Sequence, residues 1–179
     1  MTKSVLSTAT AGSNRGDTDR PPAGSVAAPA PAAVRGDDVY ARLAGPTLSA
    51  VRVVIGFLWL CHGLMAMFGW FGGVDGHGGA AAVGSWPGYW AGLIELVGGS
   101  LILIGLATRP AALIGSGAMA YAYFSVHQPE AALPIQNMGE SAALYSWIFL
   151  LFAVLGAGPF SADALLRRRR ARSWAVRGA

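Results

Sequence analysis

The feature that most constrains this chain is a run of 114 residues, 53–166, that carries only six formal charges. One arginine and five acidic residues are spread over that run, whereas six basic residues precede it and six follow it. Over the whole chain, charged residues make up 12%, about half of the roughly 25% that is typical of soluble domains. So few charges cannot give a folded segment a soluble surface. An ordinary water-soluble enzyme is therefore excluded.

Four apolar segments within this run have lengths near those of membrane-spanning helices. They cover residues 53–74, 89–107, 111–126 and 141–158. A bilayer needs about 20 apolar residues per helix, with a range of about 17–25. The third segment approaches that range when it is extended through Pro110, since proline is tolerated at a helix start. The expected fold is an all-α membrane protein, a compact bundle of four transmembrane helices.

The basic residues near these segments all fall on one side of the membrane if the chain crosses it four times. The two loops expected on the other side, 71–88 and 127–139, contain neither lysine nor arginine. Because cytoplasmic loops are enriched in basic residues, both termini are expected to be cytoplasmic. We expect the arginine run after the last segment to anchor the chain at the membrane surface. The basic residues concerned are Arg35, Arg42, Arg52, Arg109, Arg167, Arg168, Arg169 and Arg170.

This pattern divides the chain into three parts. Residues 1–36 lack an apolar period and are predicted to be a disordered tail. Residues 37–166 form the membrane domain, opening with a short helix over 37–49 that Pro46 is expected to interrupt. Residues 167–179 form an arginine-rich cytoplasmic tail.

Several classes of site are excluded by composition. The single cysteine, Cys61, excludes a disulfide framework, a cysteine-rich metal site and a dithiol redox couple within the chain, and no metal site is expected. Basic residues flank apolar segments rather than alternating with aromatic ones, which argues against a nucleic-acid partner.

Small residues recur every three or four positions in the second and third segments. They are Gly88, Gly92 and Gly99 beside Glu95 in the second, and Ala111, Gly115, Ala118, Ala122 and Ser125 in the third. Such stripes let membrane helices approach closely, because their association depends on van der Waals contact. The general abundance of Ala and Gly explains the pattern equally well, so both explanations stay open.

Five polar residues are expected in the outer half of the bundle, where they can converge on one pocket. They are His62, Glu95, His127, Asn137 and Glu140. Each also has a structural explanation: Asn137 and Glu140 fit a capping box. His127 is expected at a helix C-terminus, where the helix dipole favours a histidine. His62 can form a hydrogen bond to a neighbouring helix. Glu95 is the hardest to explain in this way, because an ionised carboxylate in hydrocarbon must pair, reach water or stay protonated.

Six short motifs, taken in their order along the chain, resemble those of a known family. They are HGLMAMFGWFGG at 62–73, ELVGGSLILIGLATRPAA at 95–112, MAYAYF at 119–124, NMGE at 137–140, GAG at 156–158 and SAD at 161–163. In order and spacing they resemble the DoxX family of small bacterial four-helix membrane proteins over residues 51–166. The resemblance has one departure: relatives have Gln-Lys where this chain has Met65 and Ala66. Glu95 is thereby left with His62 or His127 as a partner, or protonated.

The resemblance implies a place in the bacterial inner membrane and a redox context. Some relatives are the membrane subunit of thiosulfate:quinone oxidoreductase, and others belong to a membrane oxidoreductase assembly concerned with thiol and oxidative stress. We therefore expect a redox-associated subunit that binds a quinone through the outer-half residues, with the bilayer and redox proteins as partners. The sequence carries no specific haem signal. A non-catalytic scaffold and a small transporter or proton pathway remain the alternatives.

Overall fold

The computed structural model describes residues 36–177, in which the chain forms five α-helices and no strand. The helices are α1 (Gly36–Phe68), α2 (Gly88–Ile104), α3 (Thr108–Ala122), α4 (Glu140–Leu155) and α5 (Ala162–Arg177). A 3₁₀ turn, η1 (Trp70–Gly72), follows α1, and a π-helical turn, η2 (Tyr123–His127), extends α3. The predicted disordered tail, residues 1–36, lies outside the described residues apart from Gly36. The prediction of an all-α fold is confirmed for the described part of the chain.

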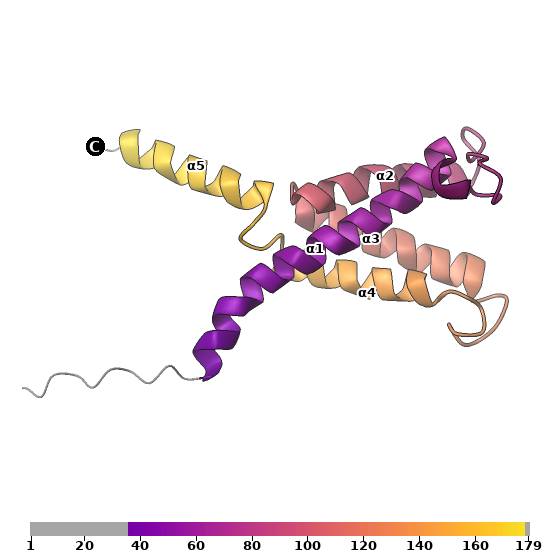
Figure 1. Cartoon of the computed structure of the whole chain (residues 1–179), viewed down its shortest axis with the longest axis horizontal. Coiled ribbons are helices and arrows are strands. Elements are labelled where there is room, and N and C mark those ends of the chain that lie inside the picture. The colour runs from indigo at the N-terminus through magenta and orange to yellow at the C-terminus, as the bar shows by residue number, and fades with distance from the viewer. Residues whose placement is uncertain (1–35, 178–179) are drawn as a thin grey trace, which may run out of the picture. The chain divides into compact units, whose positions relative to one another are not determined.

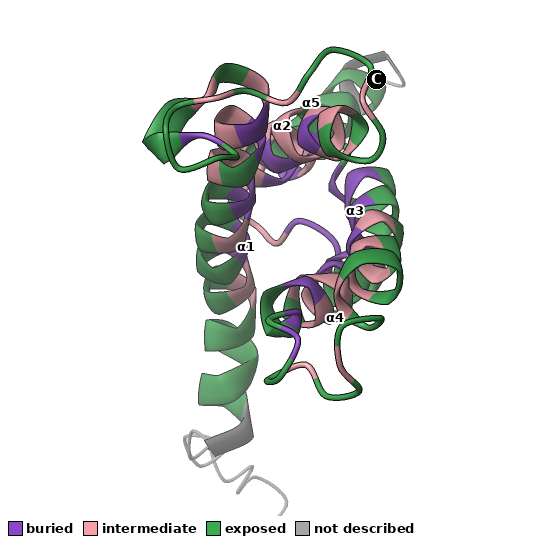
Figure 2. Ribbon diagram, turned by 90° about the vertical axis from the view of Figure 1, so that its right-hand side faces the viewer, coloured by how far each residue is buried: buried purple, intermediate pink, exposed green. Residues whose placement is uncertain are grey.

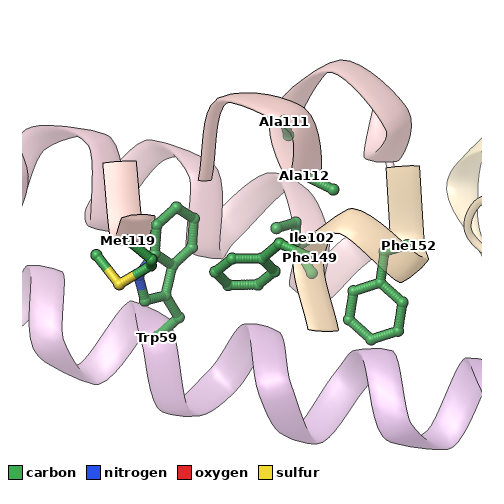
Figure 3. Close-up of a cluster of buried hydrophobic side chains, with 7 residues drawn as sticks. All are labelled: Trp59, Ile102, Ala111, Ala112, Met119, Phe149 and Phe152. Carbon is green, nitrogen blue, oxygen red and sulfur yellow. The ribbon is translucent and has the colours of Figure 1, made fainter. Parts of the chain in front are cut away.

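Helices α1 to α4 pack as two pairs, α1 along α2 and α3 along α4, and α2 also contacts α3 (Figure 1). Side chains from all four helices meet in one apolar core (Figure 3). Its members are Trp59, Ile102, Ala111, Ala112, Met119, Phe149 and Phe152. The ring centroids of Trp59 and Phe149 lie 4.4 Å apart, so α1 and α4 meet at the centre of this core.

Glycines with positive φ end the first two helices earlier than the apolar pattern predicts. The first apolar segment extends to residue 74, yet α1 ends at Phe68 because Gly69 has a φ of 69°. The second extends to residue 107, yet α2 ends at Ile104 because Gly105 has a φ of 71°. Glycine enters this left-handed region without the steric cost that other residues meet. Hydropathy alone therefore places the C-terminal ends of these two helices too late in the chain.

Pro46 does not interrupt the first helix, so the expected break is wrong. The helix α1 runs through Pro46 and changes direction in its N-terminal part (Figure 1). A proline removes one backbone hydrogen bond and can bend a helix without ending it. Two local contacts support the helix here: Ser49 Oγ donates to the Gly45 carbonyl at 3.1 Å, and Gly45 lies against the ring of Pro159.

The closest helix contact, between α1 and α2, is made by glycines on both helices. A Cβ placed on Gly56 would lie 2.6 Å from the backbone nitrogen of Leu103, and one on Gly63 would overlap the backbone of Leu96. On α2, a Cβ at Gly99 would lie 2.7 Å from the backbone nitrogen of Leu60. Small residues on both surfaces thus let the two backbones touch. The sequence pattern identified the stripe on α2 but missed Gly56 and Gly63.

The predicted stripe on α3 is only partly an inward face. Ala111 and Gly115 are buried, whereas Ser125 is exposed. A Cβ on Gly115 would lie 2.8 Å from the ring of Trp59, so this glycine leaves room for the indole in the core.

The outward faces of the four bundle helices are apolar. Buried residues lie on the inward faces in Figure 2, and large apolar side chains point outward. Exposed examples are Phe57 on α1, Val97 on α2, Leu113 on α3, and Trp147 and Val154 on α4. Within residues 36–177, one helix, Asp38–Phe68, is long and apolar enough to cross a membrane, and Gly88–Ile104 and Glu140–Leu155 are apolar but shorter.

Candidate functional site

A cavity of about 170 Å³ lies between the four helices, where the second half of α1 meets the start of α4 and the end of η2. We call it the histidine cavity. Its lining residues are Trp59, His62, Glu95, Met119, Ala122, His127, Ser141, Ala142 and Tyr145. It is open to the surface rather than sealed, and polar and apolar side chains both contribute to its wall. A small polar group with an apolar attachment therefore suits it best.

Three of the five predicted site residues line this cavity. His62 comes from α1, Glu95 from α2 and His127 from η2. His62 is exposed, and the other two are partly buried. Segments far apart in the sequence thus bring two imidazoles and a carboxyl group to one cavity. Among the described residues, no hydrogen bond or ion pair joins Glu95 to either histidine, although both were candidate partners.

Asn137 lies behind the cavity and positions His127. Both polar atoms of its side chain are hydrogen-bonded, since Nδ2 donates to the Ala131 carbonyl and Oδ1 accepts from the Gly139 amide, both at 2.8 Å. Its backbone carbonyl lies 3.1 Å from Nδ1 of His127. Because a carbonyl oxygen only accepts, Nδ1 must carry a proton in this hydrogen bond. The second imidazole nitrogen, Nε2, then remains for the cavity.

Glu140 does not line the cavity, and the capping-box interpretation of Asn137 and Glu140 is wrong. A capping box needs the asparagine at the N-cap and the glutamate three residues into the helix. In the structure Gly139 is the N-cap, no side chain caps the helix, and Glu140 is its first residue. Met138 has a φ of 56°, which keeps the preceding residues out of the helix. Glu140 is exposed.

Two aromatic residues of the cavity wall were missed by the sequence reasoning. Tyr145 of α4 stands edge-on to His62, with ring centroids 6.2 Å apart. Trp59 of α1 is 0% exposed, and its Nε1 has no hydrogen-bond partner within the described part of the chain. Figure 3 shows this nitrogen on the side of Met119, which lines the same cavity. The sequence did contain a signal for both: each is an aromatic residue with a polar N–H or O–H group inside an apolar segment, and such a group usually needs a hydrogen-bond partner.

Close packing of α1 against α2 leaves little room at position 66, where the family resemblance implied a lysine. Ala66 is 7% exposed and faces Gly92 of α2. A Cβ on Gly92 would lie 2.6 Å from the Cβ of Ala66, so the two helices touch at this point. A long side chain at position 66 would therefore have to separate α1 from α2.

The residues described in the structure show no group of three or more His, Cys, Asp or Glu that could hold a metal ion. Cys61 is a free, partly buried cysteine that does not line the cavity. The polar groups of the histidine cavity include two imidazoles and one carboxyl group, which can form hydrogen bonds and transfer protons.

The opposite end of the bundle contains a polar cluster around Arg52, a residue whose place in the sequence indicated only the membrane topology. Arg52 is 1% exposed and donates to four backbone carbonyls. Its Nε bonds to Ala157 at 2.9 Å, its Nη1 to Ile102 and to Leu103, the latter at 2.6 Å, and its Nη2 to Phe160 at 2.8 Å. These bonds join α1, the end of α2 and the segment before α5.

Asp163 completes this cluster from the first turn of α5. Its Oδ1 accepts from the Ala107 amide at 2.9 Å and its Oδ2 from the Thr108 amide at 3.1 Å. A carboxylate from one helix thus satisfies free amides at the N-terminus of another, in place of a local cap. Through Asp163, the motif at residues 161–163 connects α5 to the start of α3.

The arginine run lies on a helix rather than in an irregular tail. The helix α5 begins at Ala162, so the boundary predicted at residue 167 falls inside a helix. The four arginines of the run are all exposed. Their role as a membrane anchor stays a prediction.

Comparison with known proteins identifies the family. The family model named DoxX matches residues 47–128, which include His62, Glu95 and His127 but not Tyr145. An uncharacterized protein of Haemophilus influenzae is 43% identical over 119 residues, which cover 65% of this chain and 87% of that relative. No solved structure matches the chain significantly. The family model and the extent of the match to this relative agree with the ordered motifs: the chain is a membrane protein and belongs to the DoxX family.

Proposed function

We propose that this chain is a four-span protein of the bacterial inner membrane, where it serves as a redox-associated subunit that binds the head group of a quinone in the histidine cavity. Both termini lie on the cytoplasmic side in this proposal, and the cavity lies in the outer half of the membrane. The electrons come from a partner redox protein, because the chain has one cysteine and therefore no dithiol of its own.

Helix length and surface character support four spans. At roughly 1.5 Å per residue, the 17 residues of α2 rise about 26 Å, and the 20 residues of α3 and η2 together rise about 30 Å. These lengths are close to the hydrocarbon thickness of about 30 Å, and a slightly short helix is tolerated by local thinning. The exposed apolar side chains on α1 to α4 would face lipid.

The observation that carries the quinone proposal is the unpartnered indole N–H of Trp59. Buried donors without a partner are rare, because leaving one unsatisfied costs about 1–3 kcal/mol. The Trp59 Nε1 is such a donor, and Trp59 lines the histidine cavity. A ligand with a carbonyl oxygen would satisfy it. A quinone has two carbonyl oxygens on a flat ring, which suits a cavity of about 170 Å³ lined by aromatic residues.

The other polar groups of the cavity can supply and accept the protons that accompany quinone reduction. A bound quinone would supply an acceptor for two electrons and two protons. With its Nδ1 bonded to the Asn137 carbonyl, His127 has Nε2 free to receive or deliver a proton. Glu95 and His62 line the same cavity, so a proton has two further acceptors within it.

An adjoining groove suits the apolar tail of such a ligand. Ala122 lines both the histidine cavity and a groove of about 200 Å³ between α2 and α3. Trp86, Trp90, Tyr121 and Val126 also line this groove, which is almost entirely apolar. The head group alone needs to enter the small cavity, because whole small-ligand pockets are usually about 300–1,000 Å³.

The decisive experiment combines ligand extraction with a double-mutant cycle. The full chain is purified in mild detergent, its absorption spectrum is recorded and its lipids are extracted for quinone. His62→Ala, Glu95→Gln and the double variant are then compared for thermal stability and quinone retention. Residues that share a ligand should couple by about 0.5–3 kcal/mol. Glu140→Gln is the matched control, because Glu140 is exposed and lies outside the cavity.

The outcomes separate the proposal from its alternatives. Bound quinone that is lost in both single variants and kept in Glu140→Gln supports the proposal. Additive effects with an unchanged quinone content reject it and favour a scaffold that binds partner proteins. Proton flux in liposomes without bound quinone would instead favour a proton pathway through the same residues.

A further inference from the structure

The end of the bundle opposite the histidine cavity contains a larger cavity of about 650 Å³. We call it the arginine cavity. Two arginines line it, Arg109 from the first turn of α3 and Arg167 from α5, and the segment from Leu155 to Pro159 forms another part of its wall. Its lining is polar and apolar in similar measure. A ligand with an anionic group and apolar parts suits such a cavity.

The guanidinium of Arg109 lies beside Gly156 at the cavity wall. A Cβ on Gly156 would lie 3.3 Å from Nε of Arg109 and 3.7 Å from its Nη2, and Gly156 lines the same cavity. Gly156 has a φ of 85°, a conformation that disfavours any side chain at this point. Among the described residues, neither Arg109 nor Arg167 has a hydrogen-bond or ion-pair partner. Both charges are therefore available to a ligand.

The acidic residue of the wall does not cancel this charge. Asp163 uses Oδ1 for the Ala107 amide and Oδ2 for the Thr108 amide. The buried Arg52 lies close enough to attract it electrostatically. With its carboxylate held by these groups, Asp163 is not free to swing across the cavity and pair with Arg109 or Arg167.

A second, independent observation points to a ligand. Thr108 lines the arginine cavity, is 0% exposed, and its Oγ1 has no hydrogen-bond partner within the described residues. A buried hydroxyl without a partner in the protein can be satisfied by a bound ligand. Because Thr108 lines the same cavity as Arg109 and Arg167, its hydroxyl can add a hydrogen bond to an anion that the two guanidinium groups attract.

We infer that the arginine cavity binds the phosphate of an anionic phospholipid headgroup, with Arg109 and Arg167 as its charged ligands and Thr108 as a hydroxyl donor. Arginine binds phosphate through a planar fork of N–H groups, and basic pockets between membrane helices on the cytoplasmic side bind such headgroups. This inference rests on the proposed topology, which places this end of the bundle on the cytoplasmic side, but not on the binding of a quinone.

Apolar residues around the cavity favour a lipid over a free phosphate ion. Leu155 of the wall is 53% exposed, and Phe160, next to the wall, is 70% exposed. On α5, Leu165 and Leu166 are exposed immediately before Arg167. A helix with exposed leucines and arginines fits the surface of a bilayer, where acyl chains can cover the apolar side chains.

The test measures lipid affinity of the full chain after removal of bound lipid in detergent. Phosphatidylglycerol, phosphatidylcholine and inorganic phosphate are the three probes, and bound lipid is counted by native mass spectrometry alongside the thermal shift. Arg109→Gln and Arg167→Gln should each weaken phosphatidylglycerol binding about tenfold, and Thr108→Val should weaken it severalfold. Arg168→Gln is the matched control: it removes the same charge from the next residue of α5, which does not line the cavity.

Three results would overturn the proposal. Unchanged phosphatidylglycerol affinity in the Arg109→Gln/Arg167→Gln double variant would show that the cavity binds no headgroup. An equal loss in Arg168→Gln would assign the binding to the general charge of the arginine run. The site would be one for a free anion if inorganic phosphate bound in an Arg109-dependent way and the protein showed no preference for phosphatidylglycerol over phosphatidylcholine. If Arg109→Gln does not fold, Arg109→Lys keeps the charge and removes the fork, and weaker lipid binding is again expected.

Discussion

At one end of the bundle, Arg52 donates to four backbone carbonyls and Asp163 accepts from two backbone amides. At the other end, the described residues offer no partner to the Trp59 indole nitrogen or to the carboxyl group of Glu95. The two pairs of residues differ in whether atoms of the protein satisfy their hydrogen-bonding groups. Within the described part of the chain, the end that contains Arg52 also has one unsatisfied group, the Thr108 hydroxyl, and that hydroxyl belongs to the arginine cavity.

This contrast separates a structural role from a ligand-binding one. A buried polar group whose bonding capacity is filled by backbone atoms contributes to the fold, and its removal leaves several carbonyls unsatisfied. A polar group in a cavity without a partner adds little to the fold and remains available to a ligand. Substitutions of Arg52 and of the residues that line the histidine cavity should therefore differ in what they damage.

The largest effect is expected at Arg52. Arg52→Met should lower the free energy of unfolding by on the order of 3–5 kcal/mol, because it leaves the carbonyls of Ala157, Leu103 and Phe160 without a donor and removes a cation that attracts Asp163. Fluorescence-detected size exclusion and thermal melting in detergent measure this. Arg42→Gln removes an exposed arginine from the same helix and should change little. A folded, equally stable Arg52→Met protein would remove the distinction between the two ends.

The next effect is expected where the half of α1 that contains His62 contacts α2. Gly63→Ala should destabilise the protein by about 1–3 kcal/mol, because the new Cβ would overlap the Leu96 backbone and force α1 from α2. Gly117→Ala is the control, since nothing lies within 4 Å of a Cβ at Gly117. That control should be neutral or stabilising by up to about 1 kcal/mol. A harmless Gly63→Ala would mean that packing does not hold this end together.

A smaller effect on stability, with a larger one on ligand content, is expected at Glu95. Glu95→Gln should change the free energy of unfolding by less than about 1 kcal/mol, because an amide keeps an acceptor and gains donors in a cavity where Glu95 has no partner. Glu95→Leu loses the hydrogen-bonding groups and serves as the comparison. Thermal melts and quinone extraction measured together test this. A Glu95→Gln variant as unstable as Arg52→Met would place Glu95 in a structural cluster like that of Arg52.

The smallest effect is expected in the loop after η1, at Asp75. Its Oδ1 accepts from the amides of His77 at 2.8 Å and Gly79 at 2.9 Å, which lowers the pKa of Asp75 below its ordinary value of 3.8. Because the folded pKa is the lower one, this carboxylate stabilises the loop above the unfolded pKa and loses that effect as the pH falls through the folded pKa.

Hydrogen exchange of the His77 and Gly79 amides, measured between pH 6 and pH 3, checks this expectation. Protection of both amides should fall towards the acid end in the parent protein. In Asp75→Asn it should depend less on pH, because the amide oxygen accepts hydrogen bonds but has no charge to lose. Identical pH profiles in the two proteins would contradict the assignment.

The sequence by itself determined the helical class, the membrane setting and the family. A stretch of 114 residues with six charges leaves a chain few options, and that fact needs no coordinates. The sequence also indicated that His62, Glu95 and His127 can converge on one pocket, because their depths in the membrane follow from the rise of a helix.

Only the tertiary structure decided what each polar residue does. Arg52 and Arg109 look alike in the sequence, yet one is buried among carbonyls and the other lies at a cavity wall. Asn137 and Glu140 fitted a capping box, but the positive φ of Met138 moved the helix start to Glu140. The physical reason is that local spacing fixes where a side chain lies along its own helix. Whether it finds a hydrogen-bond partner depends on neighbours from other helices, such as the carbonyls around Arg52.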